Sequence, residues 1–245
     1  MSRRVRLAVF GVAAAGFAAL LIWGTLGIPD FGHYQGRYGH ILNRVAVNER
    51  QTTNTVTAIV FDYRGFDTMG EEFILFAAVT GVALLLRERR EQVPELRDEV
   101  RNEAVKAVGI CLVPAVLTLG LWVVAHGAIT PGGGFQGGVI LSSSLLLLWL
   151  TGSLRAYTRL TPTPYVDLTE GTGVGGFVVA GLVALLIGEP FLHNLLPYGL
   201  AGKLSSGGSL PILNWATGLA VTAAFLLLFN EFLEERSFMI AGKRK

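Results

Sequence analysis

The chain has 245 residues, of which 51% are hydrophobic and only 16% are charged, whereas soluble domains usually carry about a quarter of charged residues. This composition excludes an ordinary water-soluble globular protein. The net charge of +2 gives no sign of nucleic-acid binding, and the single cysteine, Cys111, excludes a disulfide within the chain and argues against cysteine-based metal sites.

Six apolar blocks have the length of about 20 residues that a helix needs to cross the hydrocarbon core of a membrane. They cover residues 5–26, 68–86, 104–125, 135–154, 171–188 and 210–233. The first block follows Arg3 and Arg4, as a signal peptide would, but Arg6 stands within the block, the block is long for a signal peptide, and no A-x-A-like cleavage site follows it. We therefore expect an all-α polytopic membrane protein with six transmembrane helices, the first of them uncleaved.

The lysines and arginines predict the orientation, because cytoplasmic loops are enriched in them. With the N-terminus in the cytoplasm, 15 of the 20 basic residues fall on the inner side and 5 on the outer side. Both termini are therefore expected in the cytoplasm. The charged stretch of residues 91–103 is expected to be a cytoplasmic connector between the second and third spans.

The outer segment between the first two spans has apolar residues at helical spacing. They form two groups: Tyr38, Ile41, Leu42 and Val45, then Val56, Ile59, Val60 and Tyr63. We expect two short amphipathic helices on the outer membrane surface or against a partner. A mobile loop is the alternative.

The second span contains two acidic residues near its start. Residues 73–86 give only fourteen apolar residues, about 21 Å of helix, so crossing the membrane draws Glu71 and Glu72 into the bilayer. Ionisable groups there usually face protein or a water-filled path. The alternative is that the helix starts after them and that its dipole favours them. Asp67 lies four residues before Glu71, so on a continuous helix the two carboxylates share a face.

A glycine-rich stretch, His-Gly-Ala-Ile-Thr-Pro-Gly-Gly-Gly-Phe-Gln-Gly-Gly, runs from His126 to Gly138 between the third and fourth spans. Its glycines suit a backbone that turns sharply at membrane depth. The spacing G-x-G-x-x-G within it lacks the preceding strand and following acid of a dinucleotide site. His126 is either a hydrogen-bonded structural residue or a proton carrier. No nucleophile and base pair stands out, so we expect no catalytic site, no metal and no cofactor.

The stretch from His126 to Gly138 closely resembles the signature of the B-type subunit of Mrp-type multisubunit sodium/proton antiporters (the MnhB/MrpB family), a module also found in membrane-bound hydrogenase complexes. The stretch from Phe61 to Glu71 resembles D-x-R-G-F-D-T-x-G-E near the C-terminus of the large A-type subunit, which is a separate E-type subunit in those hydrogenases. The two similarities cover nearly the whole chain. Structural residues of the two motifs are Arg64, Gly65, Phe66, Pro131, Gly132, Gly133, Gly134, Phe135, Gly137 and Gly138.

The resemblance implies a two-helix module at residues 1–90 and a four-helix module at residues 104–245, joined by the connector. It implies a non-catalytic accessory subunit in a prokaryotic cytoplasmic (inner) membrane, partnered by antiporter subunits similar to A, C, D, E, F and G. The lack of a lysine in the middle of any span fits this role, because the pumping subunits are expected to carry buried lysine and glutamate pairs. The candidates for an ion or proton path are Glu71, Asp67, His126 and Glu72.

Two other functions stay open from the sequence. The fusion of the A-type tail to the B-type module is also compatible with the membrane arm of an energy-converting oxidoreductase, with hydrogenase or quinone-oxidoreductase modules as partners. Without the resemblance, the chain is a stand-alone channel or a structural membrane protein.

Overall fold

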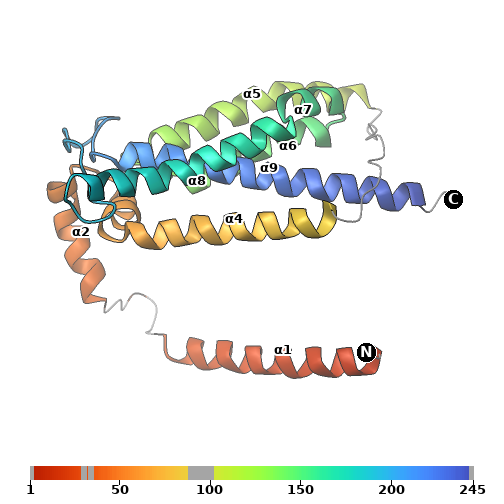
Figure 1. Ribbon diagram of the computed structural model, residues 1–245, viewed down its shortest axis with the longest axis horizontal. Helices are drawn as coiled ribbons and strands as arrows, with labels where there is room; N and C mark the ends of the chain where they lie inside the picture. The colour runs from red at the N-terminus through yellow and green to blue at the C-terminus, as the bar shows by residue number, and fades with distance from the viewer. Residues whose placement is uncertain (1–2, 29–31, 33–35, 88–101, 243–245) are drawn as a thin grey trace. The chain divides into compact units, whose positions relative to one another are not determined.

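The computed structural model describes residues 3–28, 32, 36–87 and 102–242. Within these ranges all regular elements are helices (Figure 1), as the composition predicts. The chain divides into two compact units, Met1–Ile41 and Leu42–Lys245. The expected connector at residues 91–103 lies outside the described residues except for its last two positions.

The first unit contains α1, Arg3–Leu26. Its 24 residues make about 36 Å of helix, enough to cross a bilayer. Its arginines lie at the start, and the hydroxyl of Thr25 is satisfied within the helix by the carbonyls of Leu21 and Ile22 at 3.0 and 2.9 Å. The first predicted span is therefore a continuous apolar helix.

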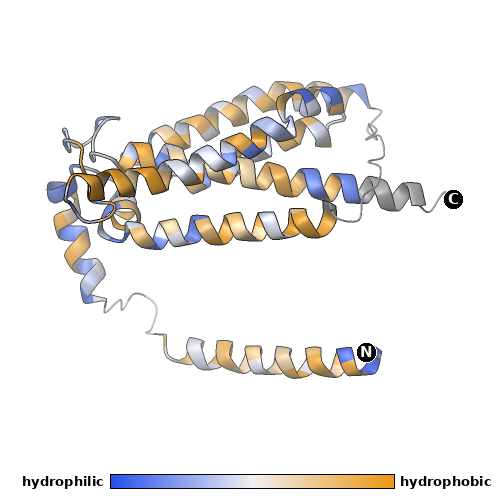
Figure 2. Cartoon of the chain, viewed as in Figure 1, coloured by the Kyte–Doolittle hydropathy of each residue, from blue (hydrophilic) through white to orange (hydrophobic). Residues whose placement is uncertain are grey.

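The second unit holds five long helices: α4 (Gly65–Arg87), α5 (Glu103–Ala125), α6 (Gly134–Leu150), α8 (Thr163–Leu186) and α9 (Leu210–Gly242). The helices α1, α4, α5, α8 and α9 are long and apolar enough to cross a membrane, and α6 is a shorter apolar helix of 17 residues, about 25 Å long. Apolar residues cover most of their length, and polar residues gather toward the helix ends (Figure 2). The six predicted spans are thus six helices of a multi-pass membrane protein.

The helix α9 forms the centre of the second unit. In its most apolar window 61% of the residues are buried, against 28% or less in the corresponding windows of α1, α4, α5 and α8. Small residues allow this packing: a Cβ added at Gly173 of α8 would lie 2.4 Å from the backbone N of Ala220 and 2.7 Å from the carbonyl O of Ala216. Close backbone approach of this kind is typical of membrane helices, where association depends on packing contacts.

The fourth, fifth and sixth predicted spans have different ends, and the sixth, α9, continues to Gly242, beyond the expected residue 233. The fourth helix stops at Leu150 because Gly152 adopts a φ of 81°, and a separate short helix follows, α7 (Leu154–Leu160). The fifth begins at Thr163, eight residues earlier than expected, because Pro164 is tolerated in the first turn of a helix. As a result, Asp167 and Glu170 lie inside α8.

One end of the second unit, which we call the loop end, gathers residues 51–64, 126–133 and 187–209 (Figure 1). Here α5 and α8 end and α4, α6 and α9 begin. The expected short helices are present as α2 (Arg37–Arg50), α3 (Thr55–Ala58) and the π-helix η1 (Ile59–Tyr63). Leu42 and Ala46 of α2 are buried, so this part of the segment packs on protein.

Candidate functional site

The connection between α5 and α6 makes a sharp, hydrogen-bonded turn. His126 ends α5, and its carbonyl accepts hydrogen bonds from the backbone N of Ile129 at 2.8 Å and of Thr130 at 2.9 Å. Gly132 and Gly133 both have a φ of 146°, a conformation that is essentially reserved for glycine. The chain reverses direction over these few residues, as the glycine density predicts.

The next glycines let α6 lie directly on its neighbours. A Cβ added at Gly134 would lie 2.3 Å from the carbonyl O of Asn214, and one at Gly137 would lie 2.3 Å from Cγ2 of Val124. The buried amide of Asn214 also accepts a hydrogen bond from the backbone N of Gly134 at 2.9 Å, which satisfies a free donor at the start of α6. Pro131 and Phe135 remain exposed.

Residues 52–57 form a second feature, which we call the polar clamp. The side-chain nitrogen of Asn54 donates to the carbonyls of Gly127 and Thr130 at 2.7 and 2.9 Å, and the hydroxyl of Thr57 donates to the carbonyl of Gly127 at 2.6 Å. Thr52 donates to the carbonyl of Ala128. The clamp therefore supplies donors to main-chain carbonyls of the turn that follows α5, where the backbone has no helical partners.

A charged network holds η1 to the rest of the loop end. Arg50 Nε donates to Asp62 Oδ1 at 2.8 Å, and Asn194 donates to Asp62 Oδ2 at 2.8 Å. The Arg50 guanidinium also lies 4.6 Å from the ring centroid of Tyr63. Burial, reinforced by the hydrogen bond to Glu49, raises the pKa of Tyr63 to about 12, so its hydroxyl remains a donor at ordinary pH. Asp62 is thus a fully bonded anchor between α2, η1 and the 187–209 loop.

The acidic residues of α4 divide between two surroundings. Asp67 and Glu71 are both exposed on the surface of the second unit, and Asp67 forms an ion pair with Arg64. Glu72 is 3% exposed, and neither of its carboxyl oxygens has a hydrogen-bond partner among the described residues. Adjacent glutamates therefore face outward and inward respectively.

The other motif residues of this segment have plain structural surroundings. Gly65 is buried, and a Cβ there would lie 3.5 Å from Cδ1 of Leu192. Phe66 is 68% exposed.

The contacts of His126 are with Trp122 rather than with these acidic residues. Its Nδ1 lies 3.1 Å from the carbonyl O of Trp122, and its ring stacks on the Trp122 indole with centroids 4.7 Å apart. Within the described part of the chain, no hydrogen bond or ring contact joins it to Asp67, Glu71 or Glu72. The structure thus gives His126 a defined role in ending α5.

The sequence reasoning missed several residues that the structure brings into focus. They are buried or bonded polar groups: Asp62, Asn54, Asn214, Glu170 and Thr217. Asp62 lies at the start of the A-type motif, and Asn214 and Thr217 are polar residues in an apolar block. Glu170 lies one residue outside the expected fifth span.

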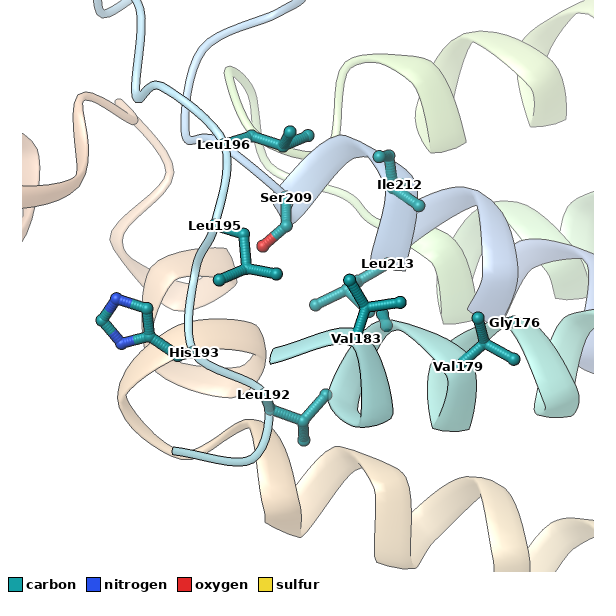
Figure 3. Close-up of a pocket in the computed structure, with 11 residues that line it drawn as sticks. Gly176, Val179, Val183, Leu192, His193, Leu195, Leu196, Ser209, Ile212 and Leu213 are labelled. Carbon is teal, nitrogen blue, oxygen red and sulfur yellow. The ribbon is translucent and has the colours of Figure 1, made fainter. Parts of the chain in front are cut away.

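Side chains that could bind a metal ion do not cluster in the part of the chain that the structure describes. No group of three or more His, Cys, Asp or Glu side chains there could hold a metal ion. A cavity of about 250 Å³ lies at the loop end between α8, the 192–196 segment and the start of α9 (Figure 3). Its lining is apolar apart from Ser209 and His193.

Known proteins share the sequence of this region. Residues 104–227 match the family described as "Domain related to MnhB subunit of Na+/H+ antiporter". The B-type subunit of the Na(+)/H(+) antiporter of Bacillus subtilis is 30% identical over 42% of this chain and 72% of its own length. A probable K(+)/H(+) antiporter protein of Rhizobium meliloti, named as a combined A/B-type subunit, is 28% identical over 80% of this chain and 21% of its own length. The latter match fits the fusion of an A-type tail to a B-type module.

Two solved structures share the fold. A chain of the membrane-bound sulfane sulfur reductase (MBS), an archaeal respiratory membrane complex, is 30% identical, with a TM-score of 0.73 over 96% of this chain and 99% of that chain. A chain of the Mrp complex from Dietzia sp. DQ12-45-1b has a TM-score of 0.70 at 22% identity, covering 96% of this chain and 26% of that chain. The family match spans half of the chain and contains the whole glycine-rich turn. The chain therefore belongs to the family of domains related to the MnhB subunit of Na+/H+ antiporters.

Proposed function

We propose that the chain is an accessory integral-membrane subunit of a multisubunit Mrp-type cation/proton antiporter, which helps to assemble the complex and contributes to an ion or proton path. Membership of the MnhB-related family supports this function. No lysine occurs between residues 107 and 202, and Lys106, at the start of the third span, pairs with the exposed Glu103, so no lysine lies in the middle of the third to fifth spans. The driving machinery for transport then belongs to its partners.

The exposed carboxylate of Glu71 is the observation that carries the proposal. It projects from a membrane-spanning helix, where a bare contact with lipid is costly for an ionisable group. Asp67 lies one turn earlier on the same exposed face. We place the ion path along this face, where a neighbouring subunit or water between subunits meets α4. Glu72 and His126 are secondary candidates, since Glu72 points into the bundle and His126 is held by Trp122.

The same proposal assigns partners and orientation. The exposed Pro131 and Phe135 beside the rigid glycine turn suit docking of another subunit, and the partners are antiporter subunits similar to A, C, D, E, F and G. The excess of basic residues in the expected inner segments supports the proposal that both termini lie in the cytoplasm of a prokaryotic cell and that the loop end lies on the outer side of its inner membrane.

Substitution of Glu71 in the assembled complex tests this function. Glu71→Gln keeps the size and removes the charge, so it should abolish ion exchange or shift its pH profile while the complex still assembles. Glu72→Gln is the matched control and should change exchange much less. An assembled Glu71→Gln complex with an unchanged pH profile would contradict the proposal.

A second function is favoured by one comparison. The match to a chain of the MBS respiratory complex covers 99% of that chain, which supports a place in the membrane arm of an energy-converting oxidoreductase. The proteins that copurify in mild detergent distinguish the two functions. Antiporter subunits alone support the first, and additional redox modules support the second.

A further inference from the structure

The first half of α8 carries a buried carboxyl group that the proposed ion path along α4 does not use. Glu170 is 6% exposed, and its Oε1 has no hydrogen-bond partner among the described residues. Glu170 lies about 10 Å along the helix from Thr163, the first residue of α8. The 24 residues of α8 make about 36 Å of helix, which is about 6 Å more than the hydrocarbon core. Glu170 therefore lies at the depth of the hydrocarbon core even if all of this excess is at the start of the helix.

Packing of α8 on α9 explains the burial of Glu170. One turn earlier, Val166 is buried in an apolar cluster that includes Ala223 of α9. One turn later, Gly173 lies so close to α9 that an added Cβ would be 2.4 Å from the backbone N of Ala220. Glu170 is therefore on the face of α8 that packs on α9, between two close contacts. Buried polar atoms in native proteins nearly always have a partner, so its unpaired oxygen needs an explanation.

The helices that pack on α8 bring no positive side chain to Glu170. They are α4 and α9, and neither residues 65–86 of α4 nor residues 210–235 of α9 include a lysine or arginine. The short helix α7 shares the apolar cluster, but its Arg155 and Arg159 are exposed. The charged groups on these stretches of α4 and α9 are all acidic: Asp67, Glu71, Glu72, Glu231, Glu234 and Glu235.

Asp167 links the buried carboxyl group to the surface. It lies three residues before Glu170, so on a continuous helix the two side chains are neighbours, and their carboxyl groups are close enough for their charges to interact. Asp167 is exposed, and the start of α8 lies at the end of the bundle opposite to the loop end (Figure 1). An ionised Glu170 without a counter-charge is strongly disfavoured, whereas a neutral Glu170 has an O–H that can donate to a carboxylate or a water molecule.

We propose that Glu170 is a buried proton-binding site and that Asp167 is the group through which the proton enters and leaves. On release, the O–H bond of neutral Glu170 breaks, the carboxylate of Asp167 takes up the proton, directly or through a water molecule, and then passes it to water at the surface. No electrons are transferred. This inference deepens the proposed function, on which it rests for its part in transport, because it assigns a proton site at the opposite end of the bundle from Glu71.

Infrared difference spectroscopy of the full-length chain in lipid nanodiscs tests the site without measuring transport. Neutral carboxylic acids absorb separately from carboxylates, and their band shifts in D2O. Glu170→Gln keeps the size of the side chain, so the spectrum of the unmodified chain minus that of this variant should contain a neutral-carboxyl band at neutral pH. Glu103→Gln is the matched control, because it changes an exposed glutamate at the start of α5, and its difference spectrum should contain no such band.

Asp167 gives a second measurement, which does not depend on the folding of the Glu170→Gln variant. Asp167→Asn changes an exposed side chain and removes the proton acceptor, so it should slow the hydrogen-deuterium exchange of the neutral-carboxyl band. Asp167→Glu restores a carboxylate at this position and should restore the rate. An exchange rate that Asp167→Asn leaves unchanged would overturn the assigned route of the proton.

The spectra also separate a proton from a metal cation. A carboxylate band in the Glu170→Gln difference spectrum, or no band at all, would overturn the proton site. Loss of the neutral-carboxyl band on adding sodium chloride, but not choline chloride, at constant pH would show a cation site and would overturn it equally. Failure of the Glu71 exchange experiment with these spectra intact would overturn only the antiporter function, and the reverse result would overturn only the proton site at Glu170.

Discussion

Replacing Gly134 by alanine tests whether close contact between α6 and α9 stabilises the fold. The new Cβ would lie 2.3 Å from the carbonyl O of Asn214 and 2.7 Å from Cβ of Thr217, so α6 must move away by about 1 Å to reach ordinary contact distance. That movement stretches the 2.9 Å hydrogen bond between the Gly134 backbone N and Asn214 Oδ1. Both groups are buried.

Three contributions set the expected loss in the free energy of unfolding. Overpacking costs about 1–3 kcal/mol and an unsatisfied buried donor about 1–3 kcal/mol, while alanine gains about 0.5–1 kcal/mol over glycine in a helix. The net loss is about 3 kcal/mol, or roughly a hundredfold in the ratio of folded to unfolded protein. Titration with SDS in mixed micelles, followed by circular dichroism, measures it.

A matched substitution separates packing from helix propensity. Gly171 lies in α8 with no heavy atom within 4 Å of an added Cβ, so Gly171→Ala should leave stability unchanged or raise it slightly. If Gly134→Ala and Gly171→Ala unfold at the same SDS fraction, the close approach of α6 to α9 contributes nothing and the reasoning is wrong.

Three further predictions concern other parts of the chain. Asn214→Leu removes the acceptor for the first backbone N–H of α6 and should cost about 1–3 kcal/mol in the same titration; an unaltered midpoint would contradict this. Burial raises the pKa of Tyr157 to about 12, whereas an unfolded tyrosine titrates near 10. The folded state therefore holds that proton more tightly, so stability falls as pH rises from about 10 to 12, and Tyr157→Phe should flatten this fall. In a Cys111→Ser background, cysteine at Ser205 but not at Lys245 should react with an impermeant reagent in intact cells; the reverse would invert the proposed orientation.

The sequence predicts the helices well because each apolar block is by itself about as long as a membrane-spanning helix. Their ends are harder to predict, since they depend on single residues such as Gly152, whose positive φ ends the fourth helix, and Pro164, which starts the fifth. Periodicity also predicted that Asp67 and Glu71 share a face. The spacing of four residues on a continuous helix is enough to predict that the two side chains share a face.

The inward position of Glu72 could not be predicted from the sequence. The helix α4 carries apolar residues on every face, so its sequence has no hydrophobic stripe that would set the rotation of the helix about its axis. Tertiary contacts set it instead, among them the packing of Gly65 on Leu192 and the hydrogen bond of 2.6 Å from Thr68 to the carbonyl of Val60. Long-range pairs such as Asp62 with Asn194 are equally invisible in sequence spacing.

The polar clamp joins the segment before α4 to the turn between α5 and α6. Its donors reach backbone carbonyls of residues 127–130, so the match depends on the path of the main chain and tolerates changes of side chain there. Because clamp and turn belong to one polypeptide, their association is intramolecular and its effective concentration is set by the intervening chain. Dilution in detergent can separate two subunits that are held by hydrogen bonds of this kind. The hydrogen bonds between the polar clamp and residues 127–130 are therefore expected to persist on dilution, because both partners belong to the same chain.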